Sequence, residues 1–181
     1  PLPITDAIPL ARQIVDGLRG GTDEGHLTVL ALLMVVAALG AAVLTLVERV
    51  SGYVVIKKLI ARTKEQAAAA LSAAIARLRA MVRTITLDNG TEFHDYERVE
   101  KAHGVPFYFA TPYHSWERGT NENTNGLIRQ YLPKGMCMRH VDQAQCNRIA
   151  LALNNRPRLR LGFKTPSEVL FARPGGVALQ S

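Results

Sequence analysis

A run of twenty residues without a charged side chain is the strongest constraint that this sequence places on its fold. The run extends from Leu27 to Leu46 and consists mainly of aliphatic residues. A helix of about twenty apolar residues can cross a bilayer, whereas a strand normally has about five or six residues. We therefore expect one continuous hydrophobic helix over residues 27–46, either spanning a membrane or buried in a soluble domain, and no strand from this region.

The residues before this run carry a second apolar pattern. Apolar side chains recur at helical spacing between Ile8 and Leu18, and Gly20-Gly21 follows them. An amphipathic helix, a glycine-rich turn and a hydrophobic span together resemble the end of an ABC-type export permease. The resemblance implies that residues 1–47 are a permease-like segment foreign to the rest of the chain, with membrane contact through residues 27–46.

The positive charge of the chain lies after this segment. Residues 1–47 contain two Arg and four acidic residues, whereas residues 48–181 contain 20 Lys or Arg and 11 Asp or Glu. Two cysteines, Cys137 and Cys146, fit neither a disulfide framework nor a zinc site and indicate a reducing compartment. We expect a polyanionic partner and a cytoplasmic location, with membrane association through residues 27–46 as the alternative.

After residue 52 the sequence alternates between strand-like and helical patterns. Strands are expected over Tyr53–Leu59, Thr84–Leu87 and Val105–Phe109. Helices are expected from the Thr63/Gln66 capping box towards Val82, and over Tyr96–His103, Gly119–Tyr131 and Val141–Leu153. This order predicts an α/β domain with some parallel pairing of strands.

Two carboxylates stand where an α/β domain could use them to bind a metal ion. Asp88 lies where a predicted strand runs into the turn Asp88-Asn89-Gly90, and Glu122 lies in a helix start rich in amides and glycine. Open α/β sheets place functional side chains at strand ends, and carboxylate oxygens suit Mg²⁺. Taken alone, Asp-Asn-Gly is more often only a turn.

Three segments carry a resemblance to a known family. They are TITLDNGTEF (Thr84–Phe93), TPYHSWERGTNENTNGLIRQYLPKG (Thr111–Gly135) and NNRPRLRLGFKTPSEVL (Asn154–Leu170). Over residues 45–171 the chain resembles the DDE transposases of the insertion-sequence thirty family. The resemblance implies a ribonuclease H-like integrase core, in which three carboxylates hold two Mg²⁺ or Mn²⁺ ions for DNA strand cleavage and transfer. It assigns catalytic and metal-binding roles to Asp88 and Glu122.

The first carboxylate of the family's site has no counterpart where the resemblance places it. That position falls at Leu30–Leu33, which is entirely apolar. Glu24-Gly25-His26-Leu27 echoes the family's Glu-Gly-Asp-Leu with His26 in place of the aspartate, but several residues too far upstream. Glu48 matches a different family position and reads as a solvated charge at a strand end. We therefore expect a core truncated at its first strand, at most one weak metal site, and little or no strand transfer.

Basic and amide side chains are the candidates for DNA contact. Four cations gather within nine residues of the C-terminal part, where they could neutralise phosphates or form an ordinary solvated loop: Arg156, Arg158, Arg160 and Lys164. Further candidates lie in or beside the helix that contains Glu122: Arg118, Asn121, Asn125 and Arg129.

The sequence thus predicts a catalytically impaired transposase core over residues 48–181 behind a hydrophobic segment over residues 1–47. The expected partner is DNA, both the ends of the insertion sequence and the target. The sequence also allows a homo-oligomer. Two alternatives remain. One is a membrane-inserted permease-tail fusion with a non-functional extension, and the other is a DNA-binding module without chemistry.

Overall fold

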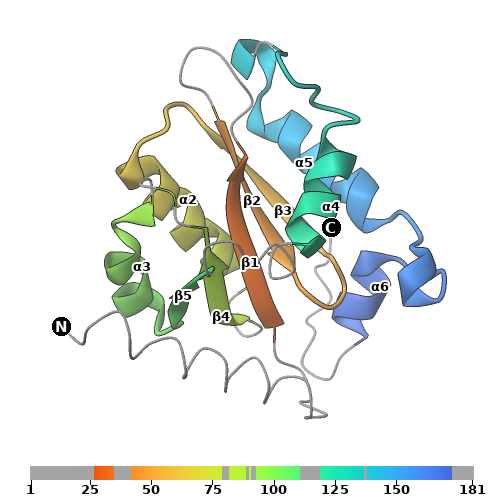
Figure 1. The fold of residues 1–181 in the computed structure, drawn as a ribbon, viewed down its shortest axis with the longest axis horizontal. Coiled ribbons are helices and arrows are strands. Elements are labelled where there is room, and N and C mark those ends of the chain that lie inside the picture. The colour runs from red at the N-terminus through yellow and green to blue at the C-terminus, as the bar shows by residue number, and fades with distance from the viewer. Residues whose placement is uncertain are drawn as a thin grey trace.

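The described part of the chain forms a five-stranded mixed sheet with helices on both faces (Figure 1). A computed structural model describes residues 27–34, 42–78, 82–88, 90, 93–110, 119–136 and 138–172, with the backbone alone for 27–34, 119–122 and 139. The strands are β1 (Leu27–Met34), β2 (Ala42–Glu48), β3 (Val54–Leu59), β4 (Val82–Leu87) and β5 (Phe107–Phe109). The helices are α2 (Lys64–Arg77), α3 (Tyr96–His103), α4 (Gly119–Ile128), α5 (Gln143–Asn154) and α6 (Pro166–Phe171).

The sheet has the strand order β3-β2-β1-β4-β5. β1 pairs antiparallel with β2, and β2 pairs antiparallel with β3, while β1, β4 and β5 run parallel to one another. The predicted α/β class with parallel pairing is confirmed. After residue 52 each predicted element is found, but some are shorter than expected. The helix expected to reach Val82 ends at Arg77, because Val82 already begins β4. The helix expected to reach Tyr131 ends at Ile128, and the strand expected from Val105 begins at Phe107.

The predicted continuous helix over residues 27–46 is wrong. β1 and β2 pair from Val29 with Glu48 to Met34 with Val43, so the uncharged run supplies two neighbouring strands. The expectation that this region provides no strand fails with it, since β1 lies in the middle of the sheet. All seven residues of β2 are buried. A strand that is buried on both faces carries a continuous apolar run, which periodicity cannot distinguish from a buried helix.

The sheet therefore includes strands from both sides of the predicted boundary after residue 47. In the part of the chain that the structure describes, no helix combines the length and the apolar character needed to cross a membrane.

Two hydrophobic cores lie on opposite faces of the sheet. Because side chains alternate along a strand, β2 contributes residues to both cores. Leu44 and Leu46 belong to the cluster that includes α2, α3 and α6. Val43 and Val47 belong to the other cluster, which α4 and α5 cover. Figure 1 shows α2 and α3 on one side of the sheet and α4 and α5 on the other.

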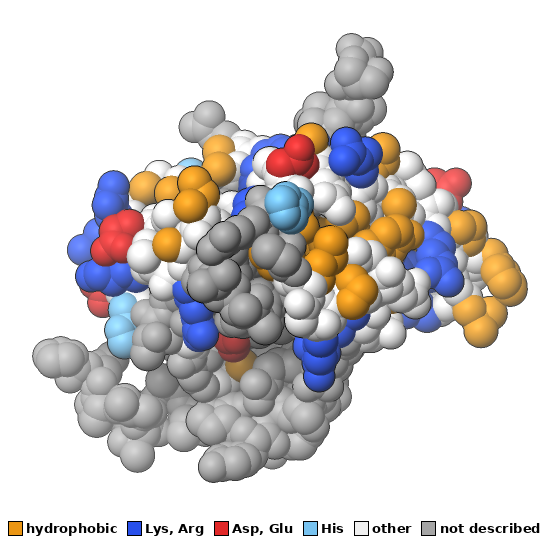
Figure 2. Space-filling view, turned by 90° about the horizontal axis from the view of Figure 1, so that it is seen from above, with side chains coloured by type: hydrophobic (Ala, Val, Ile, Leu, Met, Phe, Trp, Pro, Cys, Tyr) orange, Lys and Arg blue, Asp and Glu red, His pale blue; other side chains and the backbone are white. Residues whose placement is uncertain are grey.

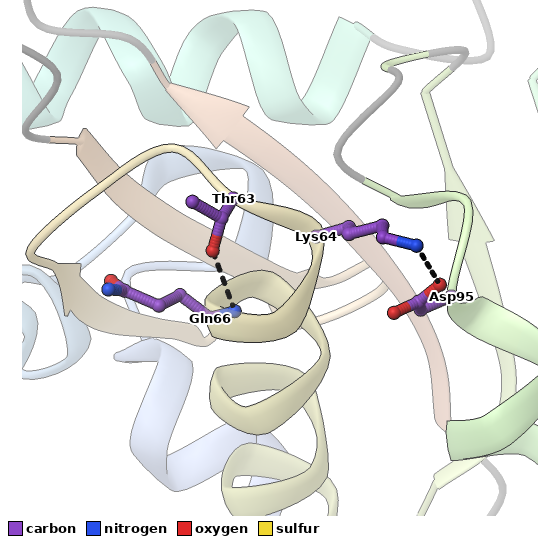
Figure 3. Close-up of polar contacts among 4 residues, drawn as sticks. All are labelled: Thr63, Lys64, Gln66 and Asp95. Carbon is purple, nitrogen blue, oxygen red and sulfur yellow. Dashed lines mark hydrogen bonds and ion pairs between the residues drawn. The ribbon is translucent and has the colours of Figure 1, made fainter.

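Polar contacts at the start of α2 confirm the predicted helix start but only half of the predicted capping box, because the Gln66 side chain accepts from the N–H groups of residues 60 and 61 and not from Thr63 (Figure 3). The Thr63 hydroxyl accepts a hydrogen bond from the Gln66 backbone N–H at 3.3 Å. Lys64 Nζ lies 3.2 Å from Asp95 Oδ1, so an ion pair joins the start of α2 to the turn before α3. The Lys64 side chain is exposed, and such surface pairs stabilise a fold by about 0–1 kcal/mol. An N-terminal helix cap typically contributes about 0.5–2 kcal/mol.

Two amide side chains of α5 form hydrogen bonds with backbone groups on the outer edge of β3, the edge that no other strand pairs with in the described sheet. Asn154 Oδ1 accepts from the Val54 N–H at 2.8 Å, and its Nδ2 donates to the Val54 carbonyl at 2.9 Å. Gln143 repeats this arrangement eleven residues earlier in α5, where it accepts from the Lys58 N–H and donates to the Ile56 carbonyl, both at 2.9 Å. These bonds pair backbone groups that an edge strand otherwise leaves open, and they fix α5 against the sheet.

We expect Asn154→Ala to lower the free energy of unfolding by about 2–3 kcal/mol, because it leaves two buried backbone groups of Val54 without partners. Urea unfolding followed by circular dichroism measures the change. The matched control is Gln145→Ala on the same helix, which removes a half-buried amide side chain that does not bond to β3. A loss in Asn154→Ala no larger than in this control would contradict the role of the amide in holding β3.

Candidate metal and DNA-binding site

Asp88 stands directly after β4, at the end of the sheet where β1 and β4 run parallel. Its side chain is half-buried, and its Oδ1 accepts a long hydrogen bond of 3.4 Å from the Gly90 N–H. The predicted turn at Asp88 is therefore present, and it coincides with the strand-end position that open α/β sheets use for functional groups.

The neighbouring strand supplies no carboxylate at this place. The paired positions end at Ala31 with Leu87, so the next step along both strands brings Leu32 beside Asp88. β1 contains no acidic residue over its whole length. Within the described ranges, no group of three or more His, Cys, Asp or Glu side chains is placed to hold a metal ion. His26, the residue that echoes the family's aspartate, lies outside the described residues.

Glu122 lies in the first turn of α4, and α4 contacts β1 and β2. The side chain of Glu122 is outside the description, so its approach to Asp88 stays a prediction. Asn125 is three positions further along the helix and therefore shares a face with Glu122. It is half-buried, and its Oδ1 is buried without a hydrogen-bond partner among the described groups.

Glu48 has a different role from the one predicted. Its side chain is only 3% exposed, so the expectation of a solvated charge is wrong. Glu48 Oε1 accepts from the Val50 N–H at 2.9 Å, and its Oε2 accepts from the N–H and the hydroxyl of Ser51, both at 2.5 Å. The carboxylate thus organises the turn between β2 and β3. The chain turns after Glu48 so that the N–H groups of the next residues bond to its carboxylate. The sequence shows only that Glu48 is at the end of a strand, and it does not reveal this turn.

The four predicted cations of the C-terminal part lie in one segment between α5 and α6, which we call the basic loop (residues 156–164). Arg156, Arg160 and Lys164 are exposed. Arg158 differs, because its guanidinium donates to the Leu153 carbonyl at 3.2 Å and its Nε is buried without a partner in the described residues. Burial, followed by the nearby charges of Arg160 and Arg156, lowers the pKa of Arg158. Arg158 therefore serves as a packing residue of the loop.

Two of the exposed arginines are held by contacts with distant segments. Arg160 Nη1 donates to the Val50 carbonyl at 2.8 Å, and Arg156 Nη1 donates to Gln130 Oε1 at 3.3 Å. Gly52 has φ +70°, and a Cβ there would lie 2.2 Å from Arg160 Nη2, so a side chain at this position would be strained and would displace the tip of the arginine. The basic loop is thus attached to the β2–β3 turn.

The remaining DNA candidates are only partly described. Arg129 is exposed just after α4, Asn121 is described by its backbone alone, and Arg118 lies outside the described residues. The sequence pattern did not single out Phe163, an exposed aromatic residue in the basic loop. The sequence could have indicated Phe163 as a candidate DNA contact, because it is an aromatic residue in a segment with four cations and no acidic residue.

Comparison with known proteins agrees with this arrangement. Residues 28–115 match the family model described as the integrase core domain. This match includes residues 28–47, which the sequence patterns had assigned to a foreign segment.

The chain is also similar to transposases of insertion sequences. It is 46% identical over 127 residues to the transposase for insertion sequence element IS4351 of Bacteroides fragilis, which covers 70% of this chain and 39% of that protein. It is 42% identical over 136 residues to the transposase InsI for IS30A of Escherichia coli (strain K12), which covers 75% of this chain and 35% of that protein. The chain thus spans little more than a third of the length of these relatives.

Two solved structures share the fold at 18% sequence identity. A chain of the simian T-cell lymphotropic virus intasome in complex with PP2A regulatory subunit B56 gamma has a TM-score of 0.66, over 89% of this chain and 58% of that one. The HTLV-2 integrase catalytic core domain in complex with magnesium (trimeric form) has a TM-score of 0.61, over 82% of this chain and 98% of that one.

We expect Glu48→Gln to lower the free energy of unfolding by about 2 kcal/mol, because the amide cannot accept all three hydrogen bonds of the β2–β3 turn. Glu97→Gln on the exposed side of α3 is the matched control. Thermal and urea unfolding of both variants measure the difference. Equal stability of the two variants would show that the turn does not depend on the carboxylate.

The chain therefore has the ribonuclease H-like fold of integrase catalytic cores and is homologous to part of an insertion-sequence transposase.

Proposed function

We propose that this chain is a transposase core that binds DNA but is catalytically impaired. The position of Asp88 carries the proposal: it stands at the end of β4 beside an apolar β1, in a chain 46% identical to an insertion-sequence transposase. The activity that such proteins perform is metal-dependent DNA strand cleavage and transfer in transposition. Asp88 and Glu122 would be the two remaining catalytic carboxylates.

The donor set does not fit a site for two metal ions. Two-ion chemistry at phosphorus needs carboxylates that clamp both ions, and β1 offers none beside Asp88. We propose instead that Asp88 and Glu122 form at most one weak site for Mg²⁺ or Mn²⁺. The HTLV-2 integrase core, described in complex with magnesium, supports this choice of ion.

We expect Mn²⁺ titrated into the purified chain to occupy a single weak site, and we expect no nicking or joining of DNA that carries insertion-sequence ends. Calorimetry measures the metal, and gel assays of labelled DNA measure the chemistry. Asp88→Asn and Glu122→Gln should each abolish the metal signal, because each removes one of two ligands.

Metal-dependent strand transfer that disappears in both variants would refute the impaired activity. It would show that another residue replaces the missing aspartate, and His26 and Asp23 would be the first to test. Metal binding that both substitutions leave unchanged would refute the site itself.

We propose that the exposed cations of the basic loop contact DNA phosphates, with Arg118, Asn121, Asn125 and Arg129 contributing beside α4. Three exposed cations in one loop supply the charge, and the contacts of Arg156 and Arg160 hold them in place. Phosphate neutralisation carries little sequence information, so the binding would be weakly selective.

We expect Arg156→Gln/Lys164→Gln to flatten the dependence of log affinity on log salt by about two units for duplex DNA, one for each lost phosphate contact. Fluorescence anisotropy over a salt series measures the slope. Arg98→Gln/Lys101→Gln on the exposed side of α3 is the matched control. An affinity that does not fall with salt, or an equal change in the control, would exclude the loop as the phosphate-binding surface.

Location and assembly follow the same proposal. We propose a cytoplasmic location, because Cys146 is a buried free thiol and free thiols are typical of a reducing compartment. One fold relative is an intasome and another a trimeric form, which supports a homo-oligomer here. The permease-like segment predicted over residues 1–47 has no support in residues 28–47, which match the integrase core domain, and residues 1–26 lie outside the described residues. The genomic DNA upstream of Pro1 tests what remains of that hypothesis.

A further inference from the structure

The basic loop is closed by its own backbone. The Arg158 N–H donates to the Lys164 carbonyl, and the Phe163 N–H donates to the Arg158 carbonyl, both at 3.0 Å. Between these bonded residues the chain forms a 3-10 turn over Leu159–Leu161, in which the Leu161 N–H also donates to the Arg158 carbonyl at 3.0 Å. Because Arg158 packs inward and Arg160 is attached to the β2–β3 turn, the loop presents a fixed surface.

Phe163 is the unusual residue of this surface. Its φ is +65°, and among the described residues it is the one non-glycine residue with a positive φ. That conformation is unfavourable for an aromatic residue. No burial compensates for it, because the side chain is 71% exposed. A strained backbone that displays an aromatic ring to solvent is typical of a functional position.

The other exposed side chains of this loop are apolar and cationic. Leu159 is 76% exposed, and Arg156, Arg160 and Lys164 are exposed as well. Residues 155–164 contain no acidic side chain. Figure 2 shows exposed hydrophobic side chains next to Lys and Arg side chains along the right-hand rim of the molecule. Duplex phosphates alone would use the cations and leave the ring without a partner.

We propose that the basic loop binds an unpaired nucleotide of DNA, with a base stacked on Phe163 and the flanking phosphates on Arg156, Arg160 and Lys164. An unpaired base offers a π-face, and its strand offers the phosphates, so one ligand uses both features of the loop. The inference rests on the proposed DNA binding and adds the substrate class, a single-stranded segment or a strand end.

The experiment compares the full chain on two labelled DNAs of equal length, a blunt duplex and a duplex with a single-stranded overhang that contains 2-aminopurine. Phe163→Leu keeps an apolar side chain but removes the ring, and Phe163→Tyr keeps the ring. Phe163→Gly also removes the ring and tolerates the positive φ, so it separates the loss of the ring from strain in the backbone, and circular dichroism checks that each variant is folded. Tyr131→Leu, at another exposed aromatic residue, is the matched control.

We expect Phe163→Leu and Phe163→Gly to weaken overhang binding by about tenfold and to abolish 2-aminopurine quenching, while duplex affinity changes less than about twofold. Phe163→Tyr and the control should retain both signals. Equal losses on duplex and overhang would overturn the stacking role. So would a change in oligomeric state, or in binding to anionic lipid vesicles, without an effect on the overhang. Duplex binding by the parent chain that does not depend on salt would instead refute the proposed function.

Discussion

The pairing of β1 with neighbours of opposite direction determines where the other described elements lie. On one side β1 continues into the antiparallel strands β2 and β3, and on the other it runs parallel to β4 and β5. Parallel pairing brings the end of β4, and with it Asp88, alongside the second half of β1. A strand in the middle of a sheet with helices on both faces favours apolar residues. β1 accordingly has leucine beside Asp88, at the place where the resemblance to DDE transposases implies a carboxylate.

The β2–β3 turn connects this sheet to the C-terminal part of the chain. The Glu48 carboxylate holds the turn from inside, and the Val50 carbonyl receives Arg160 from outside. Gly52 permits the close approach of that arginine. A surface proposed to contact DNA is therefore fixed to the core by residues about a hundred positions away, and changes in the turn should alter the loop.

Several features could be predicted from the sequence because they depend on neighbours in the chain. The caps at Thr63 and Thr165 are local, and both are present, the second as a complete capping box with Glu168. The turn at Asp88 is local as well. The uncharged run over residues 27–46 could not be read in this way, because a buried helix and two buried strands have the same apolar pattern, and only the pairing partners distinguish them.

The sequence by itself determined the alternation of strands and helices, the basic character of residues 156–164 and the absence of a carboxylate in residues 30–33. Only the tertiary structure decided which charges are available. Arg158 turns inward to a backbone carbonyl, Glu48 is enclosed by its own turn, and Phe163 is held outward by a closed ring of hydrogen bonds. The physical reason is that burial and exposure depend on segments brought together by folding, and the order of residues along the chain does not contain that information.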